Sequence, residues 1–145
     1  MISHVYSRER VAELLAAASA GDLVELADAC LSDGAELAVL TAPEIGSVAA
    51  QVREPIAFEH FFLGDVLACR AEVSLAGVRG WAMRMGDDRA ATLAAAICDA
   101  EVQADRPHAD RVLELCARVE DHRLLADRDE WARLAPTIVQ FEELT

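Results

Sequence analysis

Residues 61–88, FFLGDVLACRAEVSLAGVRGWAMRMGDD, decide the fold expected for this chain. Apolar and polar residues alternate over residues 67–75, which is typical of a half-buried strand. Gly77 interrupts the run, and a second alternation follows over residues 79–85. A three-residue loop at 75–77, with the glycine in the left-handed conformation, would join the two runs into a β-hairpin.

The register set by this loop gives the hairpin one apolar face, built from three cross-strand pairs: Ala71 with Trp81, Cys69 with Met83, and Leu67 with Met85. The opposite face collects three charged side chains, Arg70, Glu72 and Arg84. Arg70 and Glu72 could form an ion pair on this face. Alternatively, Arg70 could present its guanidinium to a carboxylate or phosphate outside the chain. Both interpretations remain open from the sequence.

Helical periodicity flanks the hairpin region on both sides. Ser7 is expected to cap a first helix and Asp22 to begin a second, which Gly34 ends. Residues 37–53 resemble another hairpin, with its turn at residues 42–46. An Ala-rich helix over residues 89–104 should then cover the apolar face of the central hairpin. We expect this helix to bury Ala71, Val73, Trp81, Met83 and Ile97.

The remaining helices are expected from Pro107 to about residue 119 and again before Pro136. The tail over residues 137–145 could form an edge strand or an arm. The sequence therefore predicts a single α+β domain over residues 1–145. Residues 1–34 form a helical pair, residues 35–86 an antiparallel sheet of about four strands from two hairpins, and residues 87–145 a helical region with a tail.

The charge of the chain excludes several classes of function. Its 26 acidic and 13 basic residues give a net charge of −13, and every basic residue is arginine. Such a surface argues against nucleic acid, and the lack of lysine excludes lysine-dependent nucleotide or Schiff-base sites. No apolar run is long enough to span a bilayer and no secretory signal is evident, so we expect a cytoplasmic protein that does not bind membranes.

No catalytic or metal-binding motif is evident. Cys30, Cys69, Cys98 and Cys116 contain no CxxC pair, which favours buried free thiols over a zinc site or a disulfide framework. We therefore predict no catalytic residue, no metal ligand and no cofactor bound by this chain alone.

Aromatic residues are concentrated in the connection over residues 55–65. It carries Phe58, Phe61 and Phe62, three of the four phenylalanines in the protein. These side chains could fill the core, or they could anchor a partner. The candidate contact residues for a partner or ligand are Phe61, Phe62, Arg70, Glu72 and Arg84.

The same region resembles a known family. Residues 61–65 (FFLGD), 70–73 (RAEV), 80–83 (GWAM) and 86–88 (GDD) are similar to the PhnG family, small subunits of the bacterial carbon–phosphorus lyase machinery. The likeness is strongest over residues 44–103. It implies an accessory subunit in phosphonate catabolism, assembled with PhnI-, PhnH- and PhnJ-like proteins and able to form a homo-oligomer when isolated.

The resemblance also implies a reaction. The complex would displace adenine from ATP with a phosphonate and form ribose 1-phosphonate 5-triphosphate, so ATP would be a substrate of the assembly. This chain would be an accessory or non-catalytic subunit of that transferase and lyase system, a ribose 1-methylphosphonate 5-triphosphate synthase. The competing hypothesis is a stand-alone acidic module that binds a small ligand between sheet and helices.

Overall fold

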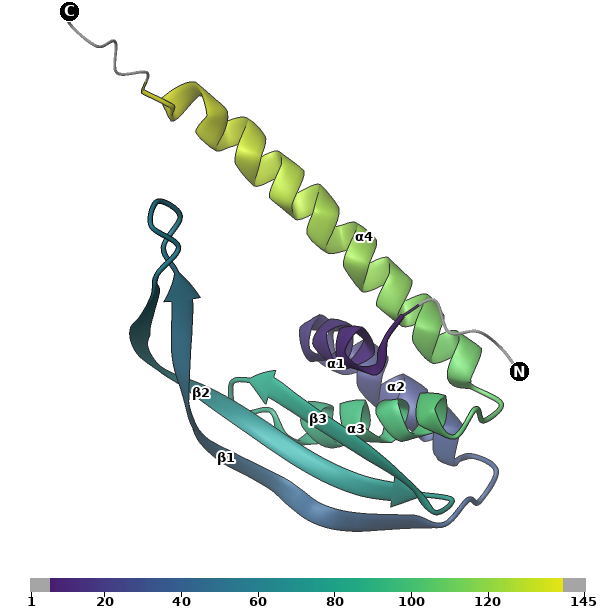
Figure 1. Ribbon diagram of the computed structural model, residues 1–145. Helices are drawn as coiled ribbons and strands as arrows, with labels where there is room; N and C mark the ends of the chain where they lie inside the picture. The colour runs from purple at the N-terminus through teal and green to yellow at the C-terminus, as the bar shows by residue number, and fades with distance from the viewer. Residues whose placement is uncertain (1–5, 140–145) are drawn as a thin grey trace, which may run out of the picture.

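The computed structural model describes residues 6–139 and confirms the α+β class. Its helices and strands, in chain order, are α1 (Arg8–Ala17), α2 (Ala20–Leu31), β1 (Leu37–Arg53), β2 (His60–Leu75), β3 (Val78–Met85), α3 (Arg89–Gln103), α4 (Ala109–Leu134) and a 3-10 turn (Ala135–Thr137). The helices gather on one side of an antiparallel sheet, and the far ends of α4 and of the β1–β2 pair project from this body (Figure 1).

Within residues 6–139 the sheet has three strands in the order β1-β2-β3, one fewer than the approximately four expected. The segment expected to turn at residues 42–46 instead continues as one long strand, β1. Register shifts between Val39 and Thr41 and between Thr41 and Glu44 interrupt the ladder around Pro43. A bulge tolerates proline within a strand because the missing backbone donor is not needed there.

The β2–β3 turn differs from the expected one by a single residue. Ala76 and Gly77 both have positive φ, 49° and 81°, and Leu75 pairs with Val78, so the loop has two residues. Positive φ at both central positions is the geometry of the primed hairpin turns. Because the loop is one residue shorter than expected, every β3 side chain lies on the face of the sheet opposite to the one expected.

The core lies between the sheet and α3. Cys69, Ala71, Val73 and Leu75 of β2 are fully buried, as Ile97 of α3 nearly is. The expected burial of Ala71, Val73 and Ile97 is therefore confirmed. The alanines of α3 allow a close approach of the helix to β3, and at Gly80 there is no room for a side chain. A Cβ built on Gly80 would lie 2.1 Å from the carbonyl oxygen of Ala96.

The N-terminal helices begin at serine caps. Ser7 accepts from the backbone N–H of Arg10 at 3.2 Å, as expected, and Ser19 accepts from that of Asp22 at 3.3 Å. The second helix therefore starts before Asp22, where it was expected to begin. Gly34 follows its end with φ of 75°.

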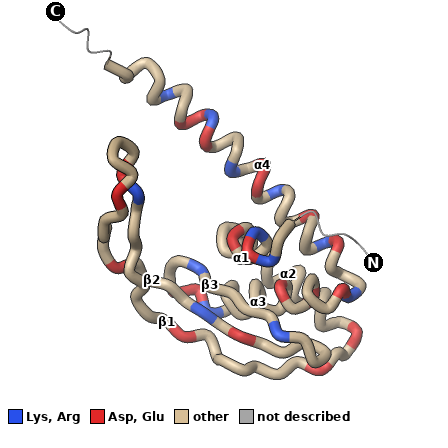
Figure 2. The backbone as a smooth tube through the Cα atoms, viewed as in Figure 1, with Lys and Arg blue, Asp and Glu red and all other residues tan. Residues whose placement is uncertain are grey.

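The C-terminal region is one continuous helix rather than the two expected. α4 runs for 26 residues through the charged stretch 120–130, and every residue from 121 to 134 is exposed. Figure 2 shows acidic and basic positions following one another along it. The tail was expected over residues 137–145. Residues 137–139 form no strand, and the rest lies outside the described residues, so a strand or arm there stays a prediction.

The four cysteines are free and buried, which confirms the expectation of unpaired thiols. Burial of Cys116 raises the pKa of its thiol to about 11. Within residues 6–139, no group of three or more His, Cys, Asp or Glu side chains is arranged to hold a metal ion. None of the helices in this part of the chain has both the length and the hydropathy to cross a membrane.

Candidate partner-binding surface

The outer face of the sheet, the side turned away from α3, combines charged and apolar side chains. The β2–β3 register places Arg70 opposite Met83 and Glu72 opposite Trp81 on this face. The expected separation into an apolar and a charged face is therefore wrong for β3. Trp81 is 38% exposed on the outer face, whereas it was expected to be buried in the core.

Both acidic–basic contacts on this face involve partners other than the expected ones. Arg70 Nε donates to Glu44 Oε1 at 2.5 Å, from the neighbouring strand β1. Glu72 accepts from Arg79 at 3.3 Å and from the hydroxyl of Thr41 at 3.2 Å. The expected Arg70–Glu72 pair is replaced because a cross-strand neighbour lies closer than a residue two positions along the same strand.

Arg84 does not share this face. It is paired with Cys69 on the side facing the helices, and its Nη1 donates to the carbonyl oxygen of Leu15 at 2.7 Å. Partial burial lowers the pKa of this guanidinium. Arg84 thus satisfies a carbonyl at the C-terminal end of α1, and it lies apart from the proposed contact residues Arg70 and Glu72.

An open apolar groove of about 790 Å³ runs between the outer face and α1. Nine apolar residues line it: Ala12, Ala16 and Ala17 of α1, Val48 of β1, Val66 and Ala68 of β2, and Trp81, Met83 and Met85 of β3. Three charged residues also line it, namely Glu9, Glu13 and Arg123. We call this the sheet–α1 groove.

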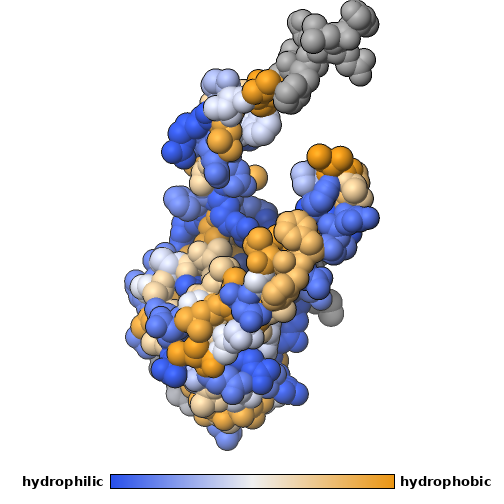
Figure 3. Space-filling view, turned by 90° about the vertical axis from the view of Figure 1, so that its left-hand side faces the viewer, coloured by the Kyte–Doolittle hydropathy of each residue, from blue (hydrophilic) through white to orange (hydrophobic). Residues whose placement is uncertain are grey.

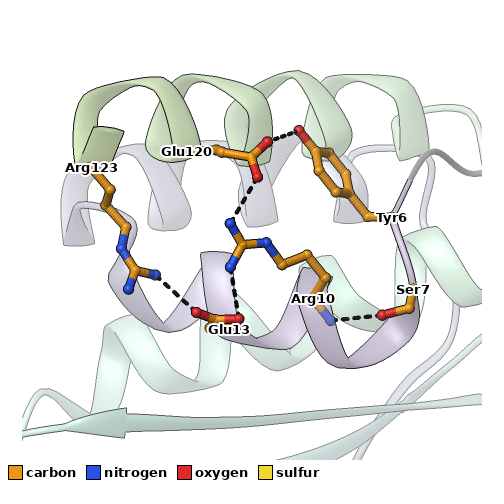
Figure 4. Close-up of polar contacts among 6 residues, drawn as sticks. All are labelled: Tyr6, Ser7, Arg10, Glu13, Glu120 and Arg123. Atoms are coloured by element: carbon orange, nitrogen blue, oxygen red, sulfur yellow. Dashed lines mark hydrogen bonds and ion pairs between the residues drawn. The ribbon is translucent and has the colours of Figure 1, made fainter. Parts of the chain in front are cut away.

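Polar contacts between α1 and α4 hold one wall of the groove in place (Figure 4). Arg10 donates to Glu120 of α4 at 2.7 Å and to Glu13 of its own helix at 2.8 Å, while Arg123 reaches Glu13 at 3.3 Å. Tyr6 also donates to Glu120, at 2.7 Å. Hydrogen bonds from Arg10 lower the pKa of both Glu13 and Glu120, so both carboxylates are ionised at neutral pH.

The far end of the β1–β2 pair carries the aromatic cluster. Phe61 and Phe62 lie in β2 itself, and only residues 54–59 form the connection, so the long aromatic loop expected from the sequence is wrong. Phe58, Phe61 and Phe62 are 66%, 48% and 59% exposed, which excludes the core as their location in this chain. Apolar surface is visible at the tip of this ribbon and again nearer the body, with hydrophilic side chains between the two, and an open gap separates this projection from that of α4 (Figure 3).

The groove could not be predicted from the sequence, because its residues come from five elements and meet only in the correct strand register. The alternation around Trp81, Met83 and Met85 was visible, but its face depended on the length of one turn. The surface has the properties of a docking site. It is apolar and open, paired charges lie beside it, and exposed aromatic side chains lie farther along the β1–β2 pair.

Two comparisons bear on what this chain is. No curated protein matches it. The family model for PhnG, described as a phosphonate metabolism protein, matches residues 6–145, nearly the whole chain. The chain therefore belongs to the PhnG family, which implies a role in phosphonate metabolism as a subunit of the multi-subunit carbon–phosphorus lyase complex.

Proposed function

We propose that this chain is an accessory subunit that supports the displacement of adenine from ATP by a phosphonate, giving ribose 1-phosphonate 5-triphosphate. The accessory role is supported by the sheet–α1 groove and the aromatic end of the ribbon, two apolar surfaces that residues 6–139 leave exposed. The reaction itself is what family membership suggests. A PhnI-, PhnH- or PhnJ-like subunit would cover this surface in the assembly.

The area of the chain supports an obligate partner. Its accessible surface is 9715 Å², whereas a compact monomer of 15.7 kDa exposes roughly 7,300 Å². The far ends of the β1–β2 pair and of α4, which project from the body, contribute to this excess (Figure 1). An excess of this order matches the area buried in permanent hetero-complexes.

The charges support our proposal that the partner subunits carry out the chemistry. Displacing a base from ATP requires a cationic clamp on the triphosphate and stabilisation of an oxocarbenium-like centre. Here Arg70 is already engaged by Glu44, Arg79 by Glu72, and Arg84 by a backbone carbonyl. This chain would therefore shape and stabilise the subunit that binds ATP, and we expect it in the cytoplasm with that substrate.

Substitution of Met85 tests the docking role. Met85 lines the groove and is 78% exposed, so Met85→Glu should leave folding intact and place a charge where an apolar partner packs. We expect lost capture of the other lyase subunits and a parallel loss of adenine release by the reconstituted complex. Val24→Glu, an equally charged change at an exposed site on α2, is the matched control. Normal assembly of Met85→Glu would refute docking through the groove.

Arg70 is tested separately. Arg70→Ala should change folding little, because its ion pair with Glu44 is half exposed on both sides. If Arg70 also contacts a partner or ligand, assembly or turnover should weaken by about 1.5–3 kcal/mol, typical of a charge-assisted hydrogen bond. Arg111→Ala, at an exposed position on α4, is the control. Wild-type turnover by Arg70→Ala would leave Arg70 as a surface ion-pair partner only.

The alternative, a stand-alone module for a small ligand, has weaker support. A second hollow of about 330 Å³ lies beside Arg70, between Glu44, Val48 and Met83. Its one cation is paired with Glu44, which disfavours an anionic ligand there. The larger groove is open rather than enclosed, which suits a protein segment better than a small molecule.

A further inference from the structure

The turn that joins β1 to β2, residues 54–59, displays two apolar side chains at the end of a projection. We call this turn the ribbon tip. Ile56 is 89% exposed and Phe58 is 66% exposed, so the rest of residues 6–139 leaves both side chains largely uncovered. Apolar surface is visible there in Figure 3. Apolar side chains held this far from the core stabilise nothing within the chain, and they gain free energy only when another surface covers them.

One residue, Glu54, satisfies every backbone N–H inside the turn. Its carboxylate accepts from the backbone N–H of Ile56 at 2.6 Å and from that of Ala57 at 2.5 Å. Its carbonyl oxygen accepts from the backbone N–H of Phe58 at 3.1 Å, and Pro55 has no N–H to satisfy. A loop normally stays at the surface because its backbone donors need water. The donors of the ribbon tip do not, so the turn can enter a dry apolar pocket without losing their hydrogen bonds.

The backbone of the turn is strained at Phe58. Its φ is 59°, in the left-handed region that glycine adopts readily and that bulky residues avoid. Glycine is the usual residue at the left-handed position of a hairpin loop. The chain therefore keeps a large apolar side chain where turn chemistry favours glycine. Strain of this kind, at an exposed position that contributes nothing to the core, is typical of a binding element.

We propose that the ribbon tip is a preformed plug, with Ile56 and Phe58 as its anchors, that enters an apolar pocket of another subunit of the lyase complex. This inference rests on the proposed accessory function and identifies the part of the chain that inserts into the partner. Glu54 is the positioning residue. It holds the turn closed before the partner arrives, so that little conformational entropy is lost on binding.

The charges beside the tip favour a protein pocket over other hosts. Residues 53–60 hold two glutamates and one arginine, and an anionic lipid surface would repel Glu54 and Glu59 at the two ends of the turn. A second copy of this chain is disfavoured for the same reason, because its sheet–α1 groove carries Glu9 and Glu13. The pocket of the partner should instead have an apolar floor and an arginine or lysine at its rim, facing Glu59.

Two variants of the anchors test the plug, by titration of the purified chain into each of the PhnI-, PhnH- and PhnJ-like subunits. Phe58→Gly removes the ring and relieves the strain. The midpoint of urea denaturation should therefore stay the same or rise, while affinity for one subunit falls roughly tenfold or more. Ile56→Glu should weaken the same binding at least as much. Val24→Glu, an equal charge change at an exposed site on α2, is the control and should bind normally.

Glu54 is tested through its effect on the turn. Glu54→Ala keeps both anchors but removes the acceptor of two backbone N–H groups. Affinity should therefore fall, and hydrogen exchange at Ile56 and Ala57 should accelerate. Glu54→Gln keeps an acceptor oxygen and should recover part of the affinity. Wild-type affinity in Glu54→Ala would show that the turn is not held ready for binding, against the proposal.

Other outcomes would also overturn the plug. They are normal binding of all three subunits by Phe58→Gly and Ile56→Glu, or a lowered denaturation midpoint in Phe58→Gly. Binding to phosphatidylglycerol vesicles, or self-association in sedimentation equilibrium, would assign the tip to a membrane or to a second copy if Ile56→Glu abolished it. If Met85→Glu loses capture while the tip variants bind normally, the groove docks the partner and only the plug is wrong. Normal capture by Met85→Glu as well would count against the proposed function itself.

Discussion

The backbone N–H of Trp81 donates to Oδ2 of Asp99 at 2.9 Å, and this carboxylate also accepts from Arg8 at 3.0 Å. The Asp99 side chain is 2% exposed, and it lies on α3 while Trp81 lies on the edge strand β3. An edge strand normally presents unpaired donors to solvent or to another chain. Asp99 satisfies one of them from within the fold.

Asp99→Ala should therefore destabilise the chain by about 3 kcal/mol, because it leaves a β3 donor and Arg8 without their buried acceptor. Asp99→Asn, which keeps an acceptor oxygen, should lose less. Urea denaturation followed by circular dichroism measures both. Asp28→Ala, at an exposed position on α2, controls for the general effect of removing an acid, and equal losses in all three variants would contradict the role.

Gly80→Ala should destabilise the chain by about 1–3 kcal/mol or more. The added methyl would meet the Ala96 carbonyl oxygen at 2.1 Å and the Ala100 backbone nitrogen at 2.6 Å, neither of which can move without moving α3. Gly46→Ala is the matched control, since a Cβ there meets nothing within 4 Å. The midpoint of chemical denaturation measures the difference, and similar midpoints for the two variants would contradict close packing of β3 on α3.

Trp81→Ala should cost less stability than its size suggests. Its ring lies on the outer face and is 38% exposed, so we expect a loss below about 2 kcal/mol. Leu75→Ala, at a fully buried position, should cost about 2–5 kcal/mol despite removing fewer atoms. Thermal and urea denaturation of the isolated chain compare the two. If Trp81→Ala lost more stability than Leu75→Ala, the ring of Trp81 would have to be packed in the core.

The α1–α4 contact should weaken in acid. The pKa values of Glu13 and Glu120 are lowered in the folded chain, so their stabilising contribution is complete above their usual value of 4.5 and is lost as pH falls below it through the lowered values. Hydrogen exchange along α4, measured against pH, should show faster opening below that point. In a Glu13→Gln, Glu120→Gln double variant this pH dependence should flatten, and an unchanged profile would contradict the network in Figure 4.

The sequence by itself determined the fold class and the burial of β2. The alternation at Cys69, Ala71, Val73 and Leu75 predicts one buried face of β2, whichever residues of β3 pair with it. The Ala-rich composition of α3 predicts that this helix packs close to the sheet. The cap at Ser7 and the start of α3 were also predictable from the sequence. At each, a side-chain oxygen accepts a hydrogen bond from the backbone N–H three residues later, so the contact is local. The family motifs lie in this same region.

Tertiary structure alone decided which face β3 presents. The sequence is compatible with a two- or a three-residue turn at Ala76 and Gly77, and the choice between them places Trp81, Met83 and Met85 either in the core or in the groove. Packing of Gly80 against Ala96 favours the observed register, since the other would bring a large side chain into that contact. The candidate partner-binding surface therefore depends on one close contact between β3 and α3, which the periodicity of the sequence does not reveal.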